Sequence, residues 1–171
     1  MTLQAVFSAS IAAVQTGANA FKDTFAPNVA LQTMLRNGTG ANQADILYAN
    51  ARTVASNSND DIDLAGVLTD AFGATIDAAE IVSVLIINAP ATGTANTTDL
   101  TIGVGTNPFL GFLGGTSPTI GPIKPGGVFM IGAGNAAGVG TVTAGSADIL
   151  RIANSTGASA TYQIAIVARS A

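Results

Sequence analysis

The chain contains no cysteine and no histidine. Without cysteine it can form neither a disulfide framework nor a thiolate zinc site, and the redox compartment stays undetermined. Without histidine it lacks both the commonest general base and the commonest metal ligand. Serine triads, cysteine–histidine dyads and the usual zinc-hydrolase sites are therefore excluded. Tryptophan is also absent and aromatic residues make up 5% of the chain, which argues against a sugar-binding platform for paired carboxylates.

Charged side chains are scarce as well. They make up 9% of the 171 residues, whereas an average soluble domain has roughly 25%. The apolar fraction is 48%, and a dispersed monomer needs a charged surface without large apolar patches. We therefore expect much of the surface to be covered by copies of the chain or by a partner. The net charge of −4 argues against a nucleic-acid partner.

Membrane insertion is the competing explanation for the low charge. No run approaches the roughly 18 consecutive apolar residues that a spanning helix needs. The first positive charge is Lys22, whereas a signal peptide begins with a basic segment. We expect a protein that is made in the cytosol, has no membrane partner and assembles with itself or with another protein.

The strongest structural signal is the run at residues 81–87, IVSVLII, which ends at Asn88-Ala89-Pro90. It is apolar at nearly every position and predicts a strand buried on both faces. Turn residues separate further strand patterns, at residues 29–35, 45–54, 99–104, 128–131, 147–153 and 160–168. The chain is thus predicted to be all-β, a single jelly-roll-like β-sandwich domain of eight to ten short antiparallel strands over residues 1–171.

The N-terminal segment can be interpreted in two ways. Alternation along residues 1–21 favours an extended strand, so residues 1–25 are expected to form an N-terminal arm or an edge strand. A helix with Leu3, Phe7 and Ile11 on one face is the alternative. Asn37-Gly38 predicts a hairpin turn after the strand at 29–35.

Asp60, Asp61 and Asp63 form the one cluster that resembles a metal site. Several carboxylates on a flexible loop suit calcium, but the spacing lacks the central glycine and closing glutamate of an EF-hand. The alternative is a solvated turn in which one aspartate caps the next segment. No catalytic residue, cofactor or small-molecule substrate is predicted.

A second candidate is the group Phe109, Leu110, Phe112 and Leu113, which is set among glycines. These four large apolar side chains could form an exposed interface patch. They could equally belong to a core strand, and the sequence does not separate the two interpretations.

Several segments carry a resemblance to a known family: GTGANQAD at 38–45, ARTVA at 51–55, DIDLAG at 61–66, LTDAFG at 68–73, PGG at 125–127, VTAGSAD at 142–148 and LRIAN at 150–154. Together they resemble a family of tailed-bacteriophage virion proteins, small proteins often encoded near the phage head genes. The resemblance spans most of the chain from about residue 38 onward and brings no catalytic residues.

The resemblance implies a capsid decoration (cement) protein, a β-rich homotrimer made in the bacterial cytoplasm and bound to the major capsid protein outside the shell. The alternative within the virion is a head-fibre or tail protein for host attachment, with the loops 91–98 and 132–140 as its recognition tip. A sugar- or calcium-dependent binding module, based on the Asp60 cluster, is the alternative from another class.

Overall fold

The structure is a computed structural model that describes residues 2–18, 22–103, 105–114 and 118–171. Within these ranges the chain forms fifteen β-strands and no helix, and the paired strands are antiparallel. The all-β prediction is therefore confirmed. Met1, Phe21 and Val104, which belong to predicted strands, lie outside the described residues. The observed strand number exceeds the expected eight to ten partly because several strands have only two or three residues.

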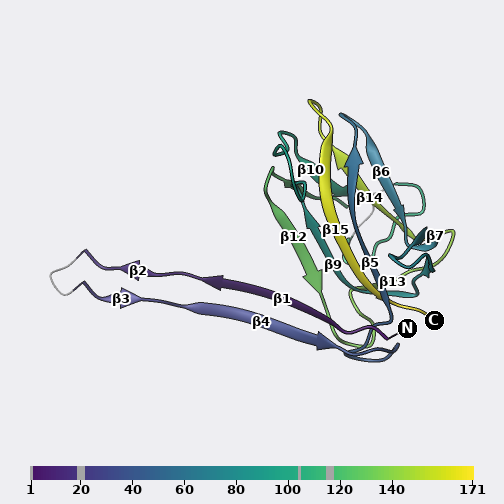
Figure 1. The fold of residues 1–171 in the computed structure, drawn as a ribbon, viewed down its shortest axis with the longest axis horizontal. Coiled ribbons are helices and arrows are strands. Elements are labelled where there is room, and N and C mark those ends of the chain that lie inside the picture. Colours follow the sequence, from purple (N-terminus) through teal and green to yellow (C-terminus); the bar gives the residue numbers. More distant parts are fainter. Residues whose placement is uncertain (1, 19–21, 104, 115–117) are drawn as a thin grey trace.

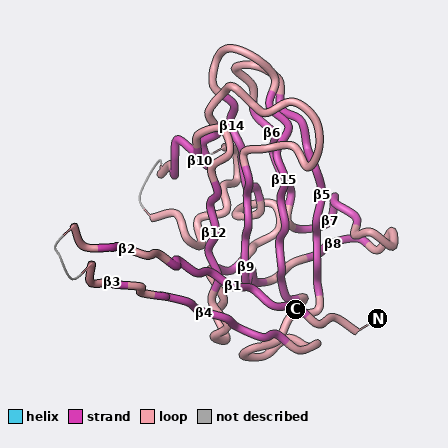
Figure 2. Tube along the Cα trace, turned by 60° about the vertical axis from the view of Figure 1, so that its left-hand side comes forward, coloured by secondary structure: helices cyan, strands magenta, loops and turns pink. Residues whose placement is uncertain are grey.

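The larger sheet contains the strand that the sequence predicted best. Its order is β12 (Val128–Gly132), β9 (Glu80–Ile87), β15 (Ala160–Arg169) and β5 (Ile46–Val54), with the short β13 (Gly140–Thr141) paired to β9. β9 lies between β12 and β15, and its residues 81–84 and 86 are buried. Figure 2 shows the long strands of this sheet running side by side down the body. The prediction of a central strand at 81–87 is confirmed, but its burial on both faces holds only for residues 81–84, because Leu85 and Ile87 are partly exposed.

The smaller sheet supplies the other half of the core. Its order is β11 (Ile120–Ile123), β10 (Leu100–Gly103), β14 (Ile149–Asn154) and β6 (Asn59–Asp63). Leu100 and Ile152 of this sheet and Ile86 of the larger sheet belong to one buried cluster. Strands β14 and β15 follow each other in the chain but belong to different sheets, so the turn after Asn154 carries the chain from one sheet to the other.

A long hairpin arm leaves the lower end of this body (Figure 1). It consists of β1 (Ala5–Ala12) paired with β4 (Asn28–Leu35), followed outward by β2 (Gln15–Thr16) paired with β3 (Thr24–Phe25). The extended interpretation of the N-terminal segment is therefore correct, and residues 2–18 form no helix. The hairpin predicted at Asn37-Gly38 is wrong, because β4 pairs with β1 and not with β5. The loop after β4 closes on itself instead, with the Arg36 amide donating to the Asn42 carbonyl at 3.0 Å.

A second, small hairpin stands beside the smaller sheet, formed by β7 (Ala65–Thr69) and β8 (Thr75–Asp77). The carboxylate of Asp70 accepts hydrogen bonds from the amides of Phe72 and Ala74 at 2.8 and 2.9 Å. This aspartate turn fixes the tip of the hairpin. Phe72 at the tip is 78% exposed.

Candidate interaction surfaces

The aspartates of the calcium candidate lie on strand β6, not on a loop. Neighbouring residues of a strand face opposite sides of the sheet, so Asp60 faces the core while Asp61 and Asp63 face outward. Arg151 holds Asp61 through two hydrogen bonds of 2.5 and 2.6 Å. The Asp63 carboxylate accepts from the Ala65 amide at 2.9 Å. No group of three potential metal ligands occurs in the described part of the chain. The alternative of a capping aspartate applies to Asp63 alone.

Asp60 ties the two sheets together. Arg52 of β5 binds its two carboxylate oxygens at 2.7 and 2.6 Å, and the Tyr162 hydroxyl of β15 donates to it at 2.8 Å. Arg52 also donates to the Tyr48 hydroxyl at 2.9 Å. Burial disfavours the Asp60 anion, but the bonds from Arg52 and Tyr162 outweigh it and hold the pKa of Asp60 below its ordinary value. Burial and the adjacent Asp60 raise the pKa of Tyr162. The network therefore has a structural role.

The Phe109 group divides between core and surface. Phe109 and Leu113 are 0% and 3% exposed. Phe112 is partly buried, and its ring lies 5.5 Å from that of Phe109 and 5.6 Å from that of Phe129. Only Leu110 is exposed. The core interpretation thus describes three of the four residues, although they lie on a loop and not on a strand. As a contact with a partner, the group offers Leu110 alone.

A glycine allows this loop to reach the core. The backbone of Gly111 lies against that of Gly140, and a Cβ added at Gly111 would stand 2.5 Å from the Gly140 Cα. Only two glycines can approach so closely. The glycines around the Phe109 group therefore bring its aromatic rings onto the sheet, where they are buried.

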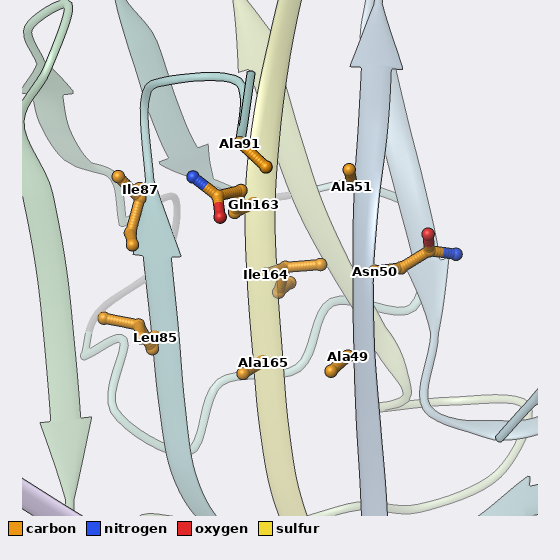
Figure 3. A pocket seen from close by; sticks show the side chains of 9 residues that line it. All are labelled: Ala49, Asn50, Ala51, Leu85, Ile87, Ala91, Gln163, Ile164 and Ala165. Carbon is orange, nitrogen blue, oxygen red and sulfur yellow. The ribbon is translucent and has the colours of Figure 1, made fainter. Parts of the chain in front are cut away.

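The outer face of the larger sheet is apolar and open to solvent. We call "outer face" the side of this sheet turned away from the shared core. Cross-strand neighbours in the observed register place the following side chains on it: Ala49, Ala51, Leu85, Ile87, Val128, Met130, Gln163 and Ala165. None of these side chains is charged. The alanines leave a shallow groove of about 300 Å³ beside Leu85 and Ile87, and Figure 3 shows it spanning β9, β15 and β5.

The lower part of the outer face is covered by the root of the arm. Phe7 and Leu35 pack there with Ala44 and Val82 in a second buried cluster, and Met130 and Val167 lie against it. The ring of Phe7 lies on Gly132, where an added Cβ would come within 2.9 Å of a ring carbon. The sheet is thus buried on both sides where the arm begins and on one side farther up.

A fully buried arginine, Arg169 at the end of β15, fastens the loops around the arm root. Its guanidinium donates to the carbonyls of Gln43, Asn135 and Ala136 at 2.9, 2.8 and 2.7 Å and forms a 2.9 Å ion pair with Glu80. Sequence reasoning missed this residue. The only signal was a charge directly after the alternating apolar residues of the last strand.

The two loops suggested as one recognition tip lie at opposite ends of the body. In the first, the Asn96 side chain donates to the Thr161 carbonyl near the start of β15 at 2.7 Å. In the second, Ala136 binds Arg169 at the last residue of the same strand. An extended strand rises about 3.3 Å per residue, so the loops are separated by roughly the length of the sheet.

Comparison of the chain with protein-family models, curated proteins and solved structures gave no match. The described residues contain no helix that is long and apolar enough to cross a membrane. The interpretation of these surfaces therefore rests on their geometry and chemistry.

Proposed function

We propose that this protein is a non-enzymatic structural protein of a bacteriophage virion, a capsid decoration protein that binds the outside of the assembled shell and stabilises it. One observation supports the proposal most: the single chain leaves one face of a projecting arm and the upper part of the outer face of its larger sheet apolar, uncharged and uncovered. Such surfaces are typical of stable interfaces, whose buried centres are poor in charge. The sequence segments that resemble tailed-phage virion proteins supply the virion context.

Decoration gives these surfaces a thermodynamic role. A protein that binds only the assembled shell lowers the free energy of that state and shifts the equilibrium away from dissociated subunits. The partners in this proposal are the major capsid protein and further copies of the chain, assembled as a homotrimer on the capsid surface. We propose that the body is a jelly-roll-like β-sandwich. The buried cluster that the larger sheet and the smaller sheet share supports this architecture.

A head-fibre or tail position for host attachment is the alternative. The projecting arm suits a fibre, because an elongated attachment protein needs a segment that reaches away from its body (Figure 1). The separation of the two loops by the length of β15 weakens this alternative, because they do not form one tip.

Sedimentation tests the proposed function. Purified protein is mixed either with empty shells of the major capsid protein from the same phage or with the unassembled capsid protein. We expect it to sediment with shells, to raise the temperature at which they dissociate, and to leave unassembled subunits unbound. Protein that stays in the supernatant with intact shells contradicts the proposal. Labelling that appears only at the tail or at a vertex of intact virions supports the alternative.

A further inference from the structure

The arm has one apolar face and one face on which apolar and polar residues are mixed. Residues directly opposite in an antiparallel pair share a face, and successive residues of a strand alternate between faces. One face carries the pairs Ala5–Leu35, Phe7–Thr33, Ala9–Leu31 and Ile11–Val29, and the same register continues to Ala13–Pro27 and Gln15–Phe25. The other carries Val6–Met34, Ser8–Gln32, Ser10–Ala30 and Ala12–Asn28. We call the first of these the apolar arm face.

The apolar arm face is buried at its root and exposed farther out. Phe7 and Leu35 are 8% and 1% exposed, whereas Ile11, Val29 and Phe25 are 75%, 73% and 66% exposed. The sequence has no charged residue at positions 2–21 or 24–35. A two-stranded hairpin by itself is at best marginally stable in water. The outer part of the arm therefore needs a surface to pack on.

The outer face of the larger sheet already binds the apolar arm face at one place. Phe7 and Leu35 pack onto its lower part through the second buried cluster, and Leu85, Ile87 and the alanines above this contact remain open. Neither surface carries a charge, so no buried ion would lack a partner if they met. The outer part of the arm points away from its own body (Figure 1) and does not lie on its own sheet.

We propose that the apolar arm face packs onto the open part of the outer face of a second copy of this chain. The incoming arm would lie beside the root of the resident arm and extend the contact that the fold has already formed. The contact joins two different surfaces, so it closes into a ring when the rotation between copies permits. A homotrimer of this kind would occupy every arm and every outer face. The inference rests on the proposed function and deepens it by assigning the contact between copies.

Light scattering over a dilution series of the full chain tests the proposal. We expect the wild type to be an oligomer. Ile11→Asp places a carboxylate on the apolar arm face and should raise the dissociation constant about tenfold or more, because the charge would be buried unpaired. Val14→Asp is the matched control, since Val14 is 72% exposed and lies on the other face. It should change the constant by less than about twofold.

The receiving surface is tested by Ala49→Asp. Ala49 is an exposed residue of the outer face, so this variant should fold normally and weaken assembly as strongly as Ile11→Asp. Circular dichroism and urea unfolding of each variant confirm that the body stays folded. A wild-type monomer at all concentrations overturns the proposal, whether the arm then binds its own sheet or the capsid protein. Equal weakening by Ile11→Asp and Val14→Asp, or no effect of Ala49→Asp, also overturns it.

The sedimentation experiment separates the two proposals. An oligomer that depends on Ile11 and Ala49 but does not bind shells contradicts the decoration function and leaves the arm contact standing. A protein that is monomeric in solution but binds shells contradicts the arm contact and leaves the decoration function standing.

Discussion

Asp60 and Asp61 are neighbours in the chain, and each is held by an arginine through two hydrogen bonds. The pairs differ in burial: the Asp60 side chain is 13% exposed and that of Asp61 is 43% exposed. Replacing each aspartate by asparagine keeps the side-chain shape and removes its charge. We expect Asp60→Asn to destabilise the protein and Asp61→Asn to have little effect.

The expected magnitude follows from the contacts. Asp60→Asn replaces an acceptor of the Arg52–Tyr162 network with an NH2 group, and a hydrogen bond to a charged group is worth about 1.5–3 kcal/mol. Because the Arg52 side chain is still 24% exposed, solvent screens the pair, and we take about 2 kcal/mol. In a chain of this size that lowers the melting temperature by about 4–8 °C. Asp61→Asn removes a surface ion pair and should cost less than about 1 kcal/mol.

The pH dependence gives a second readout of the same network. The pKa of Asp60 is lower in the folded protein than its ordinary value, so its stabilising effect is fully present above about pH 4. It is lost as the pH falls through the lower, folded pKa, because the carboxyl is then neutral in both states. The difference in unfolding free energy between wild type and Asp60→Asn should therefore shrink in that acid range.

Urea unfolding followed by circular dichroism measures these differences. All proteins are compared at one concentration, since the proposed assembly would make the unfolding midpoint concentration-dependent. The assignment of Asp60 as the link between the sheets would be refuted if Asp60→Asn and Asp61→Asn lost equal unfolding free energy. It would also be refuted if the loss for Asp60→Asn persisted below the acid range.

Two further predictions concern Arg169 and calcium. Arg169→Gln should lower the unfolding free energy by about 3 kcal/mol or more, because it leaves Glu80 and three carbonyls without their donor. Arg169→Lys should restore only part of the loss, since an ammonium lacks the planar fork of the guanidinium. An unchanged urea midpoint for Arg169→Gln would contradict the structural role of Arg169. Calcium should leave the melting temperature unchanged, because Arg52 and Arg151 occupy the carboxylates of Asp60 and Asp61; a calcium-dependent rise that Asp61→Asn abolishes would restore the metal-site hypothesis.

The sequence predicted the elements whose signals are local. The run at 81–87 is apolar on both sides and became β9 in the middle of a sheet. Residues 160–168 alternate, and every second side chain of β15 is buried from Ala160 to Ala168. Along β1 and β4, every second residue lies on the apolar arm face, and nearly all of these residues are apolar. These patterns depend only on the period of a strand.

The remaining features depend on partners that are distant in the chain. From the sequence alone Asp60 resembled a turn residue. Its partner Tyr162 is distant in the chain and lies on another sheet, so no local pattern indicated the contact. Asn37-Gly38 favours a hairpin, but β1 pairs with β4 along its whole length, and β4 forms no ladder with β5. The burial of Phe109 depends on the close approach of Gly111 to Gly140. Alternation in β5 and β15 identified two faces and could not show that one of them stays open.

An electron-microscopy map of the virion would show directly where this chain binds and what its arm contacts. We expect density for this chain on the outside of the icosahedral shell, with its body on the capsid protein and each arm lying across the outer face of a neighbouring copy. Density confined to the tail or to a single vertex, or arms that contact no neighbouring copy, would contradict this expectation.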